Sequence, residues 1–128
     1  MSHWNIWNTL PVLACTVLLA IPSWSTAAAA DDNYGAIAFS QAGGNYGYSY
    51  DYGSRAGAEQ EALNRCNASD CAVVLWFMNA CGALASGDDN GYGTGWAPSR
   101  SAAENIAMSN CRNESTNCRI TCWACTTR

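Results

Sequence analysis

The chain has 128 residues, which is the length of one domain, and charged residues make up only 12% of it. The formal net charge is −4 and all six basic residues are arginines, so the surface argues against nucleic acid and anionic membranes as partners. His3 is the only histidine. If the N-terminal region is removed, neither histidine nor lysine is left, which excludes serine–histidine, cysteine–histidine and Schiff-base catalysis.

The first thirty residues are typical of a signal peptide. The apolar run over residues 10–21 is too short for a membrane span, which needs about 20 residues. Four alanines ending at Ala30 supply the small residues that signal peptidase requires before its cleavage site. We therefore expect residues 1–30 to be a signal peptide. Residues 31–128 should form a periplasmic or secreted domain with no membrane span after processing.

Two features of this leader leave alternatives open. It contains no lysine or arginine, which a signal peptide normally carries at its start, so an uncleaved anchor is one alternative. Residues 12–15 are similar to a lipidation site ending at Cys15, but such a site normally closes the apolar run, and here the run continues to Ile21. The sequence favours cleavage after Ala30, with Cys15 discarded.

The domain contains two similar segments, over residues 34–80 and 81–125. Residues 54–59 reappear as residues 99–104, 45 positions later. The residue pairs that also correspond are Gly35 and Gly82, Cys66 and Cys111, Cys71 and Cys118, and Trp76 and Trp123. The sequence therefore indicates an internal duplication.

Each repeat predicts a strand, a strand, a helix and a strand. Short apolar segments at 35–38 and 82–85 begin the repeats, and residues 46–52 alternate tyrosine with small or polar residues, as in a half-buried strand. Ser54 and Ser99 are suited to cap helices over 54–66 and 99–111. Residues 72–77 are the clearest candidate for a buried strand. The expected fold is one small α+β domain of two pseudo-twofold related strand–strand–helix–strand repeats, stapled by disulfides.

The two predicted helices have narrow faces made mostly of alanine. The residues on these faces are Ala58, Ala62, Leu63 and Cys66 in the first helix, and Ala103, Ile106, Ala107 and Cys111 in the second. Because alanine is small, we expect each helix to lie close against a sheet.

Seven cysteines follow the leader, a density that predicts a disulfide framework in an exported domain. In each repeat one cysteine ends the helix and another begins the next strand. The simplest pairs are therefore Cys66–Cys71 and Cys111–Cys118. By loop-closure entropy each of these short loops contributes about 2–2.5 kcal/mol to stability.

Cys81 then needs a partner, and the candidates are Cys125 and Cys122. Either bridge would close a loop of about 45 residues and contribute about 4 kcal/mol. Because the two candidates are three positions apart, they point to opposite faces of a regular strand, and only one of them can reach Cys81.

These segments together resemble a bacterial family of exported proteins that is described only as a domain of unknown function. The resemblance rests on YGAIA at 34–38, CGALA at 81–85, the cysteines that end the helices, and WAC at 123–125. It covers residues 34–125 and carries no catalytic residues to transfer. The family pattern has six cysteines and lacks Cys122, which implies a Cys81–Cys125 bridge. Cys122 stands where Leu75 stands in the first repeat, so we expect a free, buried thiol.

A carboxylate pair for glycoside hydrolysis needs two acids that face each other across a cleft. Glu59 and Glu104 are equivalent in the repeats. Each lies four residues after an arginine, Arg55 or Arg100, on the same helix face. The sequence therefore favours two solvated ion pairs over a catalytic pair.

The sequence predicts no metal site and no cofactor. A zinc site of four cysteines is disfavoured, because the cysteine spacings are unusual for zinc and an exported domain oxidises its cysteines. Residues 88–91 (Asp-Asp-Asn-Gly) are similar to part of a calcium loop, but the remaining ligands and the closing glutamate are missing. We expect a turn there.

The best candidates for a binding surface are aromatic. They are Tyr46, Tyr48, Tyr50 and Tyr52, which alternate along one predicted strand, and Tyr92 and Trp96 in the comparable stretch of the second repeat. Alternation places all four rings of the first group on one face of the strand. An exposed strip of this kind suits sugar rings or a protein partner. The alternative is that the rings cover a sheet face or pack against a helix.

We expect an exported module of the bacterial envelope or medium that binds an unknown protein or a cell-wall glycan without catalysis. An inhibitor or immunity-type protein, which caps a toxin or a cell-wall enzyme, is one form of such a module. The alternatives are a cell-wall hydrolase that uses carboxylates and a structural envelope protein.

Overall fold

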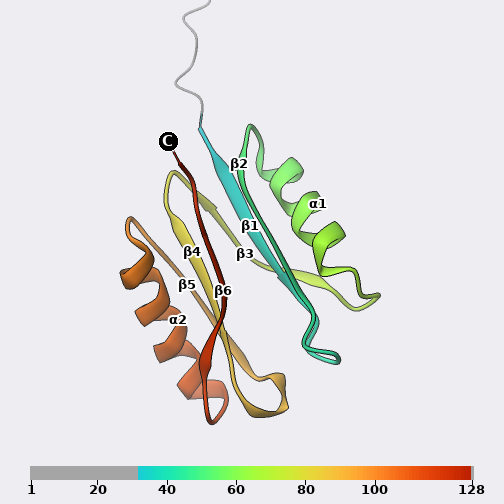
Figure 1. Cartoon of the computed structure of the whole chain (residues 1–128), viewed down its shortest axis with the longest axis vertical. Coiled ribbons are helices and arrows are strands. Elements are labelled where there is room, and N and C mark those ends of the chain that lie inside the picture. The colour runs from blue at the N-terminus through green and yellow to red at the C-terminus, as the bar shows by residue number, and fades with distance from the viewer. Residues whose placement is uncertain (1–31, 128) are drawn as a thin grey trace, which may run out of the picture.

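A computed structural model describes residues 32–127, which form two units of three strands and one helix each (Figure 1). The first unit consists of β1 (Tyr34–Phe39), β2 (Tyr46–Tyr52), α1 (Arg55–Cys66) and β3 (Ala72–Met78). The second consists of β4 (Cys81–Ser86), β5 (Tyr92–Ala97), α2 (Arg100–Glu114) and β6 (Arg119–Cys125). The predicted α+β class and the strand–strand–helix–strand order are confirmed. The expected signal peptide lies outside the described residues.

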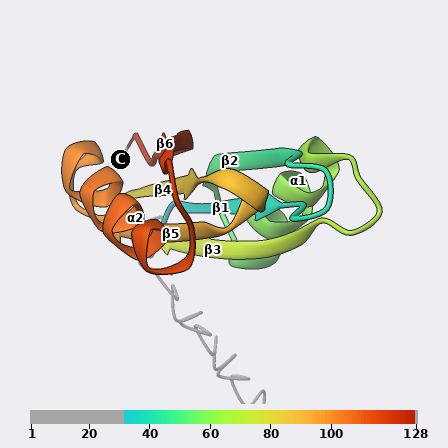
Figure 2. The ribbon, with the colours of Figure 1, turned by 90° about the horizontal axis from the view of Figure 1, so that it is seen from below.

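Each unit forms its own antiparallel sheet, with its first strand in the middle. The strand orders are β2-β1-β3 and β5-β4-β6. The two sheets face each other, α1 covers the outer face of the first sheet, and α2 covers the outer face of the second (Figure 2). The strands β2 and β6 lie along one edge of this sandwich, and β3 and β5 lie along the other (Figure 2).

The layer between the two sheets is the apolar centre of the molecule. Ile37 of β1, Leu84 of β4 and Phe77 of β3 are buried there. A Cβ atom on Gly35 would lie 2.2 Å from the Phe77 ring, and one on Gly82 would lie 2.5 Å from it. The glycine at the second position of each repeat therefore makes room for the same phenylalanine.

Each helix lies directly on the backbone of its sheet. Its buried residues are alanines and one cysteine, namely Ala58, Ala62 and Cys66 in α1, and Ala103, Ala107 and Cys111 in α2. A Cβ atom on Gly47 of β2 would lie 2.2 Å from the Ala62 carbonyl oxygen, and one on Gly93 of β5 would lie 2.2 Å from the Cys111 nitrogen. The close packing expected from the alanine faces is present in both units.

The second helix differs from the expectation in two ways. Ile106 is 42% exposed and does not belong to the buried face. A Cβ atom on Gly95 of β5 would lie 2.7 Å from the Ile106 Cβ, so the helix is too close to the strand for a large side chain to fit between them. The helix also continues beyond Cys111 to Glu114, because residues 112–114 contain no glycine or proline.

The strand β3 is an edge strand, so the expectation of a buried strand at 72–77 is wrong. Only Phe77 of β3 is buried, and Trp76 is 40% exposed. The buried strands are β1 and β4, which are short and rich in alanine. They are covered because each has a strand on both sides and a packed layer on both faces. A run of large apolar residues predicts a strand but not its place in the sheet.

The disulfides are Cys66–Cys71, Cys81–Cys125 and Cys111–Cys118. Two of them join the last turn of a helix to the residue that precedes the next strand. The third joins the first residue of β4 to the last residue of β6. Among residues 32–127 the one free cysteine is Cys122, which is buried. These are the three pairs expected from the repeat and from the family resemblance.

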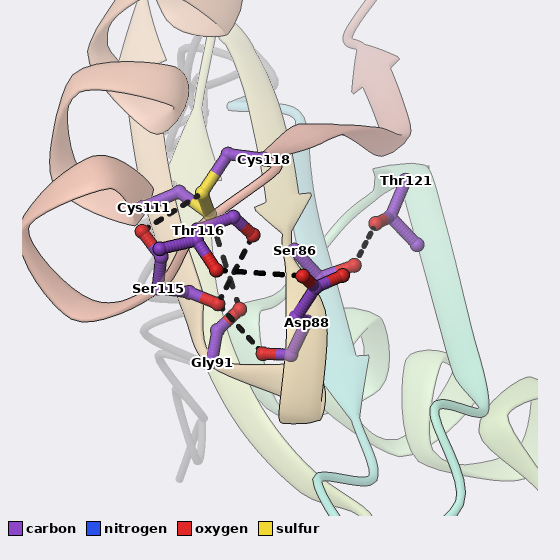
Figure 3. Close-up of a disulfide and its surroundings, with 8 residues drawn as sticks. All are labelled: Ser86, Asp88, Gly91, Cys111, Ser115, Thr116, Cys118 and Thr121. Atoms are coloured by element: carbon purple, nitrogen blue, oxygen red, sulfur yellow. Dashed lines mark hydrogen bonds between the residues drawn. A yellow bond between two sulfur atoms is a disulfide. The ribbon is translucent and has the colours of Figure 1, made fainter.

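The acidic turn between β4 and β5 holds the loop before β6. Asp88–Asn90 form a tight turn in which Asp89 and Asn90 have φ angles of 59° and 55°. The Asp88 carboxylate accepts a hydrogen bond from the Asn117 amide at 2.7 Å. The Ser115 hydroxyl donates to the Asp88 carbonyl oxygen at 2.7 Å, next to the disulfide of Cys118 (Figure 3). The segment that resembled a calcium loop is therefore a turn.

Candidate binding groove

The structure divides the tyrosine strip of β2. Tyr46, Tyr48 and Tyr50 share the face that is turned toward the second sheet, and Tyr48 packs against the inter-sheet layer. Tyr52 packs on the opposite face, with the cluster beneath α1. A β-bulge shifts the pairing of β2 with β1 near Asp51, whose φ is 60°. The bulge places the side chain of the next residue, Tyr52, on the opposite face of the strand. The expectation that all four rings share one face is wrong for Tyr52.

Tyr92 and Trp96 do not extend the exposed row of tyrosines on β2. The Tyr92 ring packs edge-on against Phe39, with 5.4 Å between the ring centroids, and it contributes to the inter-sheet layer. Trp96 is 60% exposed. Both belong to β5, which lies on the edge of the sandwich opposite β2 (Figure 2).

The strands β2 and β6 form the two walls of a groove of about 800 Å³. One wall consists of Tyr46, Tyr48 and Tyr50, so β2 contributes alternate residues. Tyr46 and Tyr50 are 43% and 46% exposed. The other wall consists of six consecutive residues of β6, 120–125. The groove thus joins two strands that are far apart in the sequence.

A hydrogen-bonded pair closes the groove at one end. The Asp51 carboxylate accepts hydrogen bonds from the Thr127 backbone N–H at 2.8 Å and from its hydroxyl at 2.5 Å. Thr127 itself lines the groove. The bulge in β2 is therefore tied to the residues that follow β6, which fixes the two walls relative to each other.

The outer margin of the groove carries Arg100, Glu104 and Trp123. The guanidinium carbon of Arg100 lies 3.7 Å from the Trp123 ring centroid, and the Arg100 Nε lies 2.7 Å from the Glu104 carboxylate. Sequence reasoning found the ion pair but missed the tryptophan. The signal that could have revealed it is the equivalence of Trp123 with Trp76, since each repeat pairs one arginine with one tryptophan.

The first repeat has the same arrangement outside the groove. The guanidinium carbon of Arg55 lies 4.4 Å from the Trp76 ring centroid, and its Nε lies 2.6 Å from the Glu59 carboxylate. Glu59 and Glu104 belong to helices that cover opposite faces of the sandwich (Figure 2). They do not face each other across a cleft, and both form the ion pairs that the sequence favoured.

Cys122 lies at the base of the groove. Its side chain faces the inter-sheet layer and is only 7% exposed. Burial raises the pKa of this thiol to about 12, because the charged form would lose its hydration. The thiol is therefore protonated at neutral pH, and a protonated thiol is a poor nucleophile.

The described residues show neither a metal-binding cluster nor a membrane-spanning helix. Among residues 32–127, no group of three or more histidine, cysteine, aspartate or glutamate side chains is placed to hold a metal ion. In the same part of the chain, no helix has the length and apolar character needed to cross a membrane.

Comparisons with known proteins find relatives of uncharacterised function. Protein Rv1269c of Mycobacterium tuberculosis is 42% identical over 96 residues, which cover 75% of this chain and 72% of that protein. The uncharacterized protein Rv1813c of the same species is 39% identical over 93 residues, which cover 73% of this chain and 60% of that protein. The NMR structure of Rv1813c superposes with a TM-score of 0.57 and 33% identity, covering 73% of this chain and 75% of that chain.

The family model that matches is described as "Domain of unknown function (DUF4189)", and it covers residues 34–125. This is the segment over which the sequence resembled an uncharacterised bacterial family. The chain belongs to the family of the domain of unknown function DUF4189.

Proposed function

We propose that this domain is an interaction module that acts outside the cytoplasm and binds a partner without catalysing a reaction. The observation that carries the proposal is the groove of about 800 Å³ between β2 and β6. Its exposed rings, Tyr46, Tyr50 and Trp123, offer apolar contact area together with polar tips. Tyrosine and tryptophan are among the residue types enriched at the positions that dominate binding energy.

The polar chemistry of the groove supports binding more than catalysis. Arg100 and Glu104 form an ion pair with each other, so neither is held ready as a general acid or base. Cys122 is protonated at neutral pH, with its pKa at about 12. The wide separation of Glu59 and Glu104 also argues against the cell-wall hydrolase that uses a carboxylate pair.

Three disulfides in the described residues support a compartment that is oxidising, as the periplasm and the medium are. The signal peptide proposed for residues 1–30 would deliver the chain there. The intact mass of protein recovered from the envelope or the medium tests this step. A mass that corresponds to a chain beginning at Asp31 supports this step. A mass that corresponds to a chain with the leader retained, or with acyl chains on Cys15, contradicts it.

Binding by the groove is tested with two matched variants of exposed aromatic residues. Tyr50→Ser removes a ring from the groove wall, and Trp96→Ser removes an exposed ring from the opposite edge of the sandwich. Each protein is immobilised and exposed to envelope and culture-medium extracts, after circular dichroism has shown that both variants are folded.

The expected result is a component that the wild-type protein and Trp96→Ser retain and that Tyr50→Ser loses. If the three proteins retain the same components, the groove is not the binding site. Release of soluble fragments from purified peptidoglycan by the protein would contradict the non-catalytic part of the proposal.

A further inference from the structure

The strand β6 has one edge that no other strand of the described residues covers. In the sheet order β5-β4-β6 it pairs only with β4. The groove is lined by six consecutive residues of β6, 120–125, rather than by alternate ones. Because side chains alternate between the two faces of a strand, a consecutive lining means that the backbone edge itself borders the groove.

The backbone groups that border the groove belong to Trp123 and Cys125. The Thr126 N–H donates to the Ala80 carbonyl oxygen at 2.9 Å, toward the β4 side. The backbone N–H and C=O groups of successive residues point in alternate directions along an antiparallel strand. Those of Ala124 therefore also point toward β4, and those of Trp123 and Cys125 point outward, away from β4. The Cα atoms of Cys81 and Cys125 are 3.9 Å apart, as expected for a pair that exchanges no backbone hydrogen bonds.

The other edge strands of the sandwich do not combine a regular, open edge with the groove. On β5, the Asn110 side-chain amide of α2 donates to the Thr94 carbonyl oxygen at 2.8 Å. The pairing of β2 with β1 is interrupted by the bulge near Asp51, and caps and bulges of this kind hinder pairing with other chains. The strand β3 has its register shift at the position equivalent to that of β6, but it contributes no residue to the groove. In β6 the shift lies before Cys122, so the segment 122–125 keeps a regular, open edge that borders the groove.

Apart from the tyrosines, most polar side chains of the groove already have partners. Arg100 is paired with Glu104, Thr127 with Asp51, and the Thr121 hydroxyl with the Ser86 hydroxyl. The remaining hydrogen-bonding capacity is therefore in the tyrosine hydroxyls and in the β6 backbone. Backbone donors and acceptors opposite a row of aromatic rings match an extended peptide, whose main chain pairs with the strand while alternate side chains contact the rings.

From this geometry we infer that the groove binds an extended peptide segment of a partner protein, which adds to β6 as a fourth strand of the second sheet. This inference rests on the proposed binding function of the groove. The segment hydrogen-bonds to the backbone of Trp123 and Cys125 and lays alternate side chains against Tyr46, Tyr48 and Tyr50. Because Arg100 and Glu104 neutralise each other, the groove selects apolar and β-branched residues rather than charged ones.

The probe is a phage-displayed library of random 12-residue peptides, panned on the oxidised protein produced from the full-length sequence. We expect peptides rich in apolar and β-branched residues, with an affinity that falls at least tenfold in Tyr50→Ser and less than twofold in Trp96→Ser. N-methylation of the selected peptide at one set of alternate residues should weaken binding at least tenfold, and at the other set far less. Bound peptide should slow amide hydrogen exchange at Trp123 and Cys125 and leave Ala124 unchanged.

Three results would overturn the inference. The first is a selection that yields no peptide sensitive to Tyr50→Ser. The second is the binding of a glycan oligomer from digested peptidoglycan that no peptide displaces and that Tyr50→Ser abolishes. In that case the groove would remain a binding site, but its ligand would be a glycan. The third is a concentration-dependent dimer in analytical ultracentrifugation that protects Trp123 and Cys125 in the absence of peptide, which would make a second copy the occupant. If Tyr50→Ser changes the binding of no extract component, peptide or glycan, the proposed function fails as well.

Discussion

Cys122 of β6 lies opposite Leu84 of β4 in the register of the second sheet, on the face that packs against the first sheet. The equivalent pair in the first sheet is Leu75 and Ile37. A thiol therefore occupies a position that the other repeat fills with an apolar side chain.

We predict that Cys122→Val changes the free energy of unfolding by less than about 1 kcal/mol, because valine is an apolar residue of similar size. Cys122→Ser should cost about 1–3 kcal/mol, because it buries a hydroxyl among apolar groups. Denaturant unfolding of the two variants measures both changes. Alkylation of the wild-type thiol should proceed no faster than unfolding exposes it. Rapid alkylation of the native protein, or a Cys122 disulfide in non-reducing peptide mapping, would contradict this account.

The disulfides should differ in their contribution to stability, because they close loops of different length. Cys81 and Cys125 are 44 positions apart, and Cys66 and Cys71 are 5 apart. Replacing both cysteines of the long loop with serine should lower the free energy of unfolding by about 4 kcal/mol, and replacing both of the short loop by about 2 kcal/mol. Unfolding in guanidinium chloride compares the two double variants. Equal losses would show that native-state contacts, rather than loop closure, dominate.

Gly47 should not tolerate a side chain, because α1 lies directly on it. A Cβ atom there would lie 2.2 Å from the Ala62 carbonyl oxygen and 2.3 Å from the Cys66 nitrogen. Gly47→Ala should therefore lower the free energy of unfolding by about 1–3 kcal/mol or more. The matched control is Gly53→Ala, since a Cβ atom at Gly53 would have no atom within 4 Å and its φ lies outside the left-handed region. The control should be neutral or stabilising by up to about 1 kcal/mol. Similar losses in the two variants, measured by thermal unfolding, would refute the close helix–sheet contact.

Asp70 should make stability depend on acidic pH. Its carboxylate accepts hydrogen bonds from the Ser40 hydroxyl at 2.6 Å and from the Ala42 N–H at 3.2 Å, and these bonds lower the pKa of Asp70 from its ordinary value of 3.8. A carboxyl whose pKa is lower in the folded state stabilises the protein above its unfolded pKa, and this stabilisation is lost as the pH falls through its folded pKa.

We therefore predict that Asp70→Asn is less stable than the wild type near pH 7 and that the difference shrinks as the pH falls below about 4. Unfolding followed at a series of pH values measures the difference. Ser40→Ala removes the principal cause of the pKa shift of Asp70. The difference in stability between this variant and the wild type should also shrink as the pH falls below about 4. A difference between wild type and Asp70→Asn that stays constant across the series would contradict the prediction.

Local features of the sequence were sufficient to predict the class of the fold and much of its covalent structure. Ser54 and Ser99 are the N-caps of the two helices, and each accepts a hydrogen bond from the backbone N–H three residues later. The spacing of the cysteines in the repeats indicated the two short disulfides, and the match of Cys122 with Leu75 indicated a buried thiol. Caps, short loops and repeat equivalences depend on residues that are near in sequence or copied at a constant offset, so they can be read from one chain.

The tertiary structure decided where the groove forms and on which face each aromatic side chain lies. A bulge at Asp51 turned Tyr52 away from the other tyrosines, and the central place of β1 left β3 at the edge of its sheet. The groove exists because β2 and β6, from different repeats, lie on the same edge of the sandwich. Strand neighbours, bulges and edges depend on which distant backbone groups pair with each other, and alternation along a single strand contains no information about that pairing.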